Sequence, residues 1–516
     1  MKKILTLCLL CLGIQASAQD PYFNHTIVNS SDVFGTSRYV SMGGAMGALG
    51  ADISTIGTNP AGISMISKNE VSLTAGVSWL SDNSASDFSK TTFAKFDQIG
   101  AVASFKLDGK VRNVNLAFNY QKKADYNRAF FGETTTKASW VDQLCGLADA
   151  AYYYRDDLYG DPHTYNYTLY GLMDKSGLLN VPIAKSPTDY NNTLSTTSGA
   201  LNSYEFNIST NIDNRYFLGF TLGFDNLNYN RMTDYFEYRT GTDNSVQDFF
   251  YNNHQRVSGS GFNLKFGAIV RPIESSSFRI GFTIETPTWY KLKYIDDQFL
   301  ETMYDDYGKY IPSNLPTYQH YVYDLSDSYI NYLEYKITTP WKVRAQMGST
   351  ISTNFAWGAE YEYANYSGTT MKYPGSYGST VSDEAFNFET QNIFKPQHTF
   401  RAGMEFKPIS SLSLRAGYNY ITTATMPDAS WDPYWVDSAL AYPTGFDYMN
   451  LSDTHIITCG LGYRYKWFFA DVAYKYRKQS GEYFAFNPDY STDATMSAIP
   501  VDLSSHSLTA TIGVRF

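Results

Sequence analysis

The chain has 516 residues with a formal net charge of −10 at pH 7, and 17% of its residues are aromatic. An acidic, tyrosine-rich chain is a poor nucleic-acid binder, so no nucleic-acid partner is expected. The 45 tyrosines and 8 tryptophans instead suit a protein that places aromatic girdles at two membrane interfaces.

The first 18 residues have the pattern of a secretory signal peptide. Two lysines precede an apolar run from Ile4 to Ile14, and Ala16-Ser17-Ala18 supplies a small-residue cleavage site. Gln19 is then the expected first residue of the mature chain. Beyond it no apolar stretch approaches the ~20 residues that a membrane helix requires. The sequence therefore predicts an exported chain, either a soluble periplasmic protein or an outer-membrane barrel.

Residues 19–69, called the hatch segment below, do not alternate in polarity. They are rich in glycine and alanine, which allow short helices to pack tightly, and Asp52 can cap a brief helix that Pro60 helps to terminate. The glycine-rich run is not a nucleotide loop, because no strand precedes it and no Lys-Ser/Thr pair follows it. About fifty residues of this kind ahead of a barrel suit a small, mostly helical plug in the lumen.

From residue 70 onward the chain alternates between apolar and polar residues with a period of two. In the last strand Leu508, Ile512 and Phe516 fall on one face and Arg515 on the other, which indicates one face in lipid and one in a wet interior. The alternation predicts about fourteen strands, an even number as bacterial barrels require. The expected strands cover residues 71–79, 99–105, 113–120, 203–212, 215–225, 262–268, 278–285, 341–347, 355–362, 400–406, 412–419, 457–464, 468–475 and 505–516.

The links between these strands are sorted by length. Short turns alternate with long polar loops, as in outer-membrane barrels, where the turns are periplasmic. A soluble sandwich also accommodates alternating strands, but it has no reason to sort its loops. The sequence thus predicts an all-β transmembrane protein, a 14-stranded antiparallel barrel over residues 70–516 with both termini periplasmic. The short turns are Asp108-Gly109, Asp213-Asn214, Thr353-Asn354 and Pro408 to Ser410, and the long links run from Asp125 to Ala200, Trp289 to Tyr329 and Thr423 to Ser452.

Charged residues within the strands fall on the non-lipid face. The expected arrangement is a lumen of paired charges and water, and any subset of these residues is available for a conduction path. They are Glu205, Arg279, Glu285, Lys342, Arg344, Glu360, Glu362, Arg401, Glu405, Arg415, Arg464 and Lys475.

The hatch segment carries two distinctive motifs, Met42-Gly43-Gly44-Ala45 within a stretch from Arg38 to Ala48, and then Asn59-Pro60-Ala61. Further motifs are Pro287 to Tyr290, the hairpin from Phe400 to Tyr420 and the terminal Phe516. Together they resemble the FadL/TodX family of outer-membrane transporters for long-chain fatty acids and other hydrophobic compounds. The resemblance covers the mature chain and implies a fourteen-strand barrel closed by an amino-terminal hatch.

The resemblance also implies passive transport: a hydrophobic compound enters from outside, binds beside the hatch and leaves sideways through the barrel wall. It assigns hatch or gating roles to Arg38, Met42, Gly43, Gly44, Asn59, Pro60 and Ala61, and a barrel-assembly role to Phe516. Asn59 and Pro60 alternatively serve only to end a helix. We expect an apolar pocket lined partly by Met42 to Leu49, and a side opening near the third strand.

The outer loop over residues 122–200 is unusually long and tyrosine-rich, which leaves the substrate open. Within it, residues 139–153 have helical apolar spacing, suited to a substrate groove or to a lid. This placement puts Cys145 in an outer loop and Cys459 on the lipid face, too far apart to form a disulfide.

No constellation of residues indicates an enzyme, a cofactor or a metal site. The expected partners are a hydrophobic small molecule or lipid, outer-membrane lipid and lipopolysaccharide, and the barrel-assembly machinery. A second hypothesis remains open, a scaffold barrel that binds a protein partner at its wall within a larger secretion complex. An energised receptor is disfavoured, because its ~22 strands exceed this chain.

Overall fold

The computed structural model describes residues 20–29, 31–136, 188–240, 246–302, 321–324, 331–375, 378–427, 429–430, 447–486 and 497–516. The predicted signal peptide, Cys145 and the helix predicted over residues 139–153 lie outside these residues.

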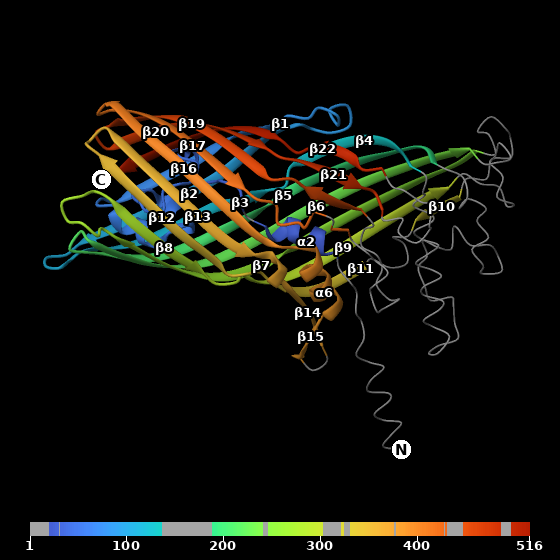
Figure 1. The fold of residues 1–516 in the computed structure, drawn as a ribbon, viewed down its shortest axis with the longest axis horizontal. Coiled ribbons are helices and arrows are strands. Elements are labelled where there is room, and N and C mark those ends of the chain that lie inside the picture. Colours follow the sequence, from blue (N-terminus) through green and yellow to red (C-terminus); the bar gives the residue numbers. More distant parts are fainter. Residues whose placement is uncertain are drawn as a thin grey trace, which may run out of the picture.

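The alternating strands form one closed antiparallel barrel (Figure 1). The barrel closes because β1 (Glu70–Leu80) pairs on one side with β2 (Thr92–Lys106) and on the other with β23 (Ser505–Arg515). Fourteen strand positions surround the lumen, as the sequence predicted. Several positions consist of two segments in line, separated by a short break.

The remaining wall segments follow in chain order. They are β3 (Val111–Asp125) with β4 (Arg128–Thr136), β5 (Thr188–Ile212), β6 (Tyr216–Thr240), β7 (Val246–Val270), β8 (Arg279–Glu285) with β9 (Trp289–Thr302), β11 (Asn331–Thr338) with β12 (Lys342–Ile351), β13 (Phe355–Asn365) with β14 (Thr370–Pro374), β16 (Pro396–Ile409), β17 (Leu412–Ile421), β18 (Tyr448–Leu451) with β19 (Thr454–Tyr465), β20 (Phe468–Lys478) with β21 (Ser480–Phe484), and β22 (Ile499–Asp502), which leads into β23.

Smaller elements extend this wall. β10 (Tyr321–Asp324) pairs with β9, and β15 (Thr380–Ser382) pairs with β14. The helix α6 (Glu384–Ile393) follows β15, and a single 3-10 turn η5 (Tyr366–Gly368) separates β13 from β14. Figure 1 shows β14, β15 and α6 projecting from the side of the barrel.

The predicted strand faces are confirmed in the last strand. Leu508 and Ile512 are 44% and 54% exposed on the outside, whereas Arg515 points inward and pairs with Glu70. Cys459 is likewise exposed on the outer wall. Among the described residues, no helix is long and apolar enough to cross a membrane.

A row of tyrosine–histidine pairs repeats on the outer wall at matching strand ends. The hydroxyl of Tyr361 lies 2.8 Å from Nδ1 of His398, and the pairs Tyr418–His455 and Tyr474–His506 repeat the arrangement at 2.8 and 2.7 Å. Each pair satisfies two polar groups that would otherwise face an apolar surrounding. The row has the character of an aromatic girdle, which marks a membrane interface.

Several predicted strand boundaries are wrong. The link expected from Asp125 to Ala200 contains β4 and the first half of β5, and the links around β6, β7 and β9 likewise contain long strand segments. In these segments tyrosine, threonine and asparagine take the place of aliphatic residues. The sequence therefore shows no apolar face there, although the strands remain paired. The turn expected over Pro408 to Ser410 starts later, because β16 continues to Ile409 through a break in register after Phe406.

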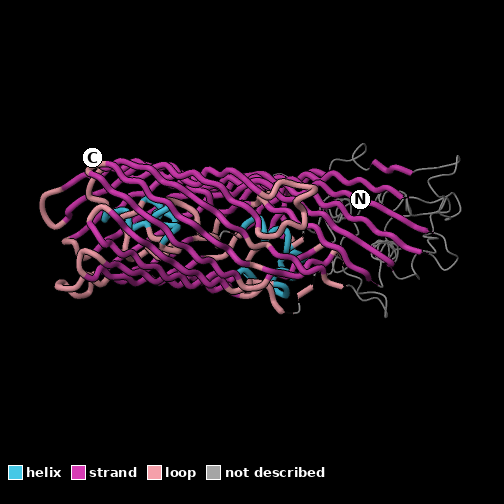
Figure 2. Tube along the Cα trace, turned by 90° about the horizontal axis from the view of Figure 1, so that it is seen from above, coloured by secondary structure: helices cyan, strands magenta, loops and turns pink. Residues whose placement is uncertain are grey.

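The hatch segment lies inside the barrel (Figure 2). It contains α2 (Pro21–Val28), α3 (Ser37–Ser41), η1 (Ile53–Gly57) and η2 (Pro60–Met65). Asp52 caps η1 by accepting a hydrogen bond from the amide of Ser54, as predicted. The expectation for Pro60 is wrong: η1 ends at Gly57, and Pro60 occupies the first turn of η2, where its missing N–H costs nothing.

Candidate functional site

Glycines in the wall receive the glycine-rich part of the hatch segment. A Cβ added to Gly403 would overlap the carbonyl oxygen of Met42, and one added to Gly417 would overlap the amide of Gly43. Gly43 and Gly44 themselves have positive φ of 62° and 76°. The Met42–Gly44 turn is therefore seated directly against the backbone of β16 and β17. Gly358 and Gly460 receive Ala45 and Ser41 in the same way.

The Asn59-Pro60-Ala61 motif is seated against the opposite part of the wall. Gly219 of β6 receives Pro60, and Gly267 of β7 receives Asn59. The Asn59 side chain is fully buried; its Oδ1 accepts from the amide of Ala61 at 3.1 Å and its Nδ2 donates to Gln346 Oε1 at 2.7 Å. The motif thus caps η2 and ties it to β12 at once.

Arg38 connects the hatch segment to the charged lumen. Its guanidinium donates to the carbonyl of Ala51 at 2.7 Å and lies 3.4 Å from Glu405 of β16. Glu405 pairs in turn with Arg415, 2.6 Å away. Ten of the twelve predicted lumen charges are buried, all except Arg279 and Arg464. The level of the barrel around Arg38 is therefore filled by paired charges.

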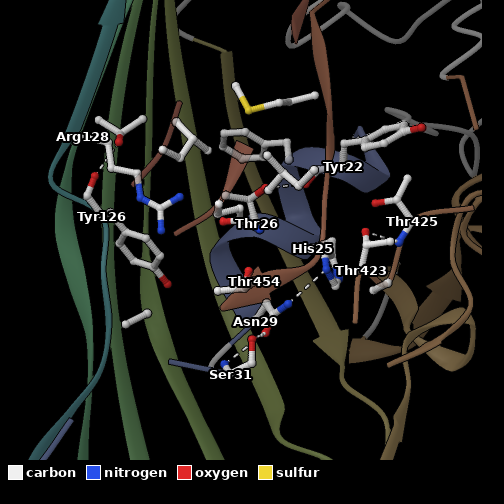
Figure 3. A pocket seen from close by; sticks show the side chains of 18 of the residues that line it. Tyr22, His25, Thr26, Asn29, Ser31, Tyr126, Arg128, Thr423, Thr425 and Thr454 are labelled. Atoms are coloured by element: carbon white, nitrogen blue, oxygen red, sulfur yellow. Dashed lines mark hydrogen bonds between the residues drawn. The ribbon is translucent and has the colours of Figure 1, made fainter. Parts of the chain in front are cut away.

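An aromatic cavity of about 190 Å³ lies above this charged level, around α2. Tyr22 and Phe23 of α2 face it together with Tyr126, Phe130 and Tyr229 of the wall. In Figure 3 α2 stands in the middle of the cavity, with Tyr126 and Arg128 on one side and Thr423 and Thr425 on the other. The aromatic rings give this part of the cavity an apolar lining.

Charged groups line one part of the same cavity. Arg128 and Arg477 contribute guanidinium groups, and Asp32 contributes a carboxylate that pairs with Lys475 at 2.8 Å. Nε and Nη1 of Arg477 are buried without a hydrogen-bond partner among the described residues. Buried donors without a partner are costly, so this corner favours an anionic or carbonyl oxygen.

The wall is split beside this cavity, between β2 and β3. Their ladder begins at Lys106–Asn113 and ends at Gln98–Gln121. Above that pair, β2 continues to pair with β1, and β3 continues to pair with β5, but no ladder pair joins β2 residues 92–97 to β3 among the described residues. We call this break in the ladder the side window; it agrees with the interrupted pairing between two wall strands that was expected near the third strand.

The side window lies at the level of the outward apolar band. Across β1, its residues Phe96 and Ala94 stand opposite Ala75 and Val77, and Phe96 and Val77 are 41% and 40% exposed. Above the window, the amide of Phe131 donates to the hydroxyl of Ser84 at 3.1 Å. The first outer loop therefore crosses to β4 and limits the window from above.

Phe34 of the hatch segment stands behind the side window. Its carbonyl accepts a 2.9 Å hydrogen bond from Gln121 Nε2, and its ring lies 4.1 Å from the Lys475 ammonium and 5.3 Å from that of Lys95. The cavity lies beside the β3 edge of the window, because Ala124 of β3 and the nearby Tyr126 line it.

The structure brings the predicted hatch residues to two seats rather than to one pocket. The cavity around α2 is not lined by Met42 to Leu49, which pack against the wall glycines, so a pocket beside that stretch stays a prediction. Sequence reasoning missed α2 as the element that lines the cavity. The signal was present, because Asp20 followed by Pro21 before an apolar run is a helix start. Within the described residues no cluster of side chains is suited to a metal ion.

No family model matches the sequence, and no curated protein matches it. Solved structures of similar fold include a Pseudomonas aeruginosa FadL homologue (13% identity, 94% of this chain and 99% of that chain, TM-score 0.49) and the Ralstonia pickettii toluene transporter TbuX (11%, 95% and 99%, 0.46). The Pseudomonas putida toluene transporter TodX is similar at 12% identity over 95% of this chain and 99% of its own, with a TM-score of 0.47. In fold, the chain is similar to these FadL/TodX-type barrels, as its motifs predicted.

Proposed function

We propose that this chain carries a hydrophobic compound passively across the outer membrane of a Gram-negative bacterium and releases it sideways into the bilayer. The observation that carries the proposal is the side window, which lies at the level of the apolar band and has its β3 edge beside the aromatic cavity at Ala124. A lipid that leaves through such a gap never crosses water. Open backbone at membrane depth is tolerated only where protein or water satisfies it.

The hatch segment acts as the gate in this proposal. Its two seats against the wall glycines hold α3, η1 and η2 in place, whereas Phe34 is bound to Gln121 at the edge of the window. The small conformational change needed for passage is then a displacement of Phe34 and its neighbours, not the removal of the hatch from the barrel. In this proposal the charged level around Arg38 closes the direct aqueous path to the periplasm, and the ion pairs of Glu405 with Arg38 and Arg415 support it.

The favoured substrate is an amphiphile with an acidic head, such as a long-chain fatty acid. Tyrosine rings suit the alkyl chain, and the unsatisfied donors of Arg477 suit the carboxylate. In proteoliposomes, Arg477→Gln should reduce uptake of oleate and leave uptake of a neutral hydrocarbon unchanged. Equal loss for both compounds would assign Arg477 a structural role instead.

A single cysteine at the window tests the exit. Ala94→Cys places a thiol on the exposed edge of the window, and Ala101→Cys places one on the same face of β2 where the ladder is intact. Both are made in a Cys145→Ser/Cys459→Ser background and labelled with a bulky maleimide. Labelling at residue 94 should block release of the hydrophobic compound, whereas labelling at residue 101 should not.

The outcome separates transport from the scaffold hypothesis. Equal uptake by the two labelled proteins rules out the window as the exit. Absence of any uptake by the unlabelled protein, together with a stoichiometric bound protein partner in native mass spectrometry, would favour a scaffold barrel. Ion conduction through the assembled barrel in bilayer recordings would instead indicate an ordinary porin.

A further inference from the structure

Three lysines form one row across neighbouring strands on the outer wall, far around the barrel from the side window. Lys291 of β9 is the cross-strand partner of Lys336 of β11, and Lys336 is the partner of Lys372 of β14. All three are exposed. Since neighbouring strands lie about 4.8 Å apart, the row spans roughly 10 Å.

The three adjacent ammonium groups repel one another. Like charges that lie directly opposite on adjacent strands destabilise a sheet. Glu334 offsets one of them, with its carboxylate 3.5 Å from the Lys291 ammonium. Among the described residues, no carboxylate pairs with Lys336 or Lys372. The row therefore has a surplus of positive charge that an anion from outside can neutralise.

The position of the row relative to the membrane identifies the anion. Directly below it, Trp289 pairs across strands with Phe262, and their rings stack with centroids 6.0 Å apart. Trp289 is 45% exposed, as in an aromatic girdle at the membrane interface. Lys291 is two residues beyond Trp289 on β9, a rise of about 7 Å. The lysines thus stand at the level of lipid headgroups.

The row also has hydroxyl groups at both ends. Ser260 of β7 is the cross-strand partner of Lys291, and Ser382 of β15 is the partner of Lys372. The ordered series Ser–Lys–Lys–Lys–Ser carries three ammonium groups flanked by two hydroxyls, with the Glu334 carboxylate beside Lys291. Lysine binds phosphate as a compact point charge, and serine hydroxyls add hydrogen bonds.

We propose that Lys291, Lys336 and Lys372 bind the phosphorylated glycolipid headgroup of the outer leaflet, the lipid A part of lipopolysaccharide. The site rests on the proposed outer-membrane location but not on the transport mechanism. A glycolipid with two phosphates on its sugar backbone presents its negative charge at the same depth as the row. Three cations within about 10 Å suit a bis-phosphorylated headgroup better than one with a single charge.

The test uses the full mature chain, purified and placed in phosphatidylcholine nanodiscs. Binding of bis-phosphorylated lipid A is followed by native mass spectrometry. The triple variant Lys291→Gln/Lys336→Gln/Lys372→Gln should bind on the order of a hundredfold more weakly, since each lysine near a membrane surface contributes about a fivefold effect. The charge-preserving triple Lys→Arg variant should retain binding. Heat-modifiable migration confirms that both variants are assembled.

A matched control removes the same charge from the opposite end of the barrel. Lys68, Lys106 and Lys110 are exposed beside the short turns, and their replacement by Gln should leave lipid A binding unchanged. Equal loss in this control, or no loss in the Lys291/Lys336/Lys372 variant, overturns the site. Equal binding of phosphatidylglycerol, or complete displacement by millimolar inorganic phosphate, overturns the assignment to lipid A. Failure of this site leaves the window experiment unaffected, so the two proposals are tested separately.

Discussion

Gln121 donates a 2.9 Å hydrogen bond to the carbonyl oxygen of Phe34 at the point where the ladder between β2 and β3 ends. Gln121, the last β3 residue that pairs with β2 below the side window, therefore also holds Phe34 behind the window. This connection makes the position of Phe34 depend on the same strand that forms one edge of the window.

Phe34→Ala should open the path from the cavity to the window. The phenylalanine side chain is 4% exposed, and its removal leaves a cavity between two ammonium groups that water can enter. We expect faster uptake of a hydrophobic fluorescent compound in proteoliposomes, with a stability loss of about 3 kcal/mol. Phe105→Ala, on the exposed face of β2, is the control and should change neither. Slower uptake by Phe34→Ala would show that the ring guides the substrate rather than blocking it.

Gly403→Ala should loosen the seat of the hatch segment. The added methyl group would overlap the Met42 carbonyl, so the turn must shift, at a cost of roughly 1–3 kcal/mol. The expected result is a lower unfolding midpoint in urea. Gly368→Ala is the control variant, because no atom lies within 4 Å of a Cβ added at that position. If both variants unfold at the wild-type midpoint, the turn is not held by this contact.

Replacing Asn59 and Pro60 together by alanine tests the gating role that the motif was given. Loss of the cap and of the Asn59–Gln346 hydrogen bond should free η2 from β12, at a cost of about 1–2 kcal/mol. We expect altered uptake with normal barrel assembly and heat-modifiable migration. Wild-type uptake would leave the motif with a purely structural role.

The docking of α2 should respond to pH through two opposed groups. Burial lowers the pKa of His25 from 6.5 to about 3, so its contribution is present above pH 6.5 and is lost as the pH falls toward 3. Burial raises the pKa of Asp20 from 3.8 to about 7, so its contribution is present below pH 3.8 and is lost as the pH rises through 7. Between pH 3.8 and 6.5 the two effects oppose one another.

Wild-type protection of α2 from hydrogen exchange should therefore change little between pH 6.5 and 4. In Asp20→Asn only the histidine effect remains, and protection should fall by up to tenfold per pH unit below 6.5. The double variant Asp20→Asn/His25→Phe should be insensitive to pH again. A steep pH dependence in the double variant would place the titrating group elsewhere.

The membrane-level wall could be predicted from the sequence because its pattern has a direct physical cause. Leu508 and Ile512 must meet lipid, and Arg515 cannot, so a period of two fixes the faces. Above the membrane this cause disappears. In β6, for example, Tyr229 and Asn230 alternate between a packed interior and water, and the polarity of the side chains no longer reports the strand.

The side window could be anticipated only through family resemblance. It arises where β3 leaves β2 after Gln121, and a register shift near Ala75 of β1 accompanies the change. No residue type marks the end of a ladder. The ladder ends because of how neighbouring strands pair, and this cannot be read from single residues. The contacts of the hatch segment with the wall could not be predicted for a similar reason. In the sequence Gly403 and Gly417 are ordinary small residues of alternating strands, and only the structure shows Met42 and Gly43 packed against them.

The 25-residue strands β5, β6 and β7 have a consequence for where the chain meets its substrate. At about 3.3 Å per residue such a strand is roughly 80 Å long, more than twice what the ~25 Å apolar band requires even when tilted. The mouth of the barrel then stands well beyond the membrane surface. If the chain carries a hydrophobic solute as proposed, that solute enters the barrel at a distance from the bilayer rather than at its surface.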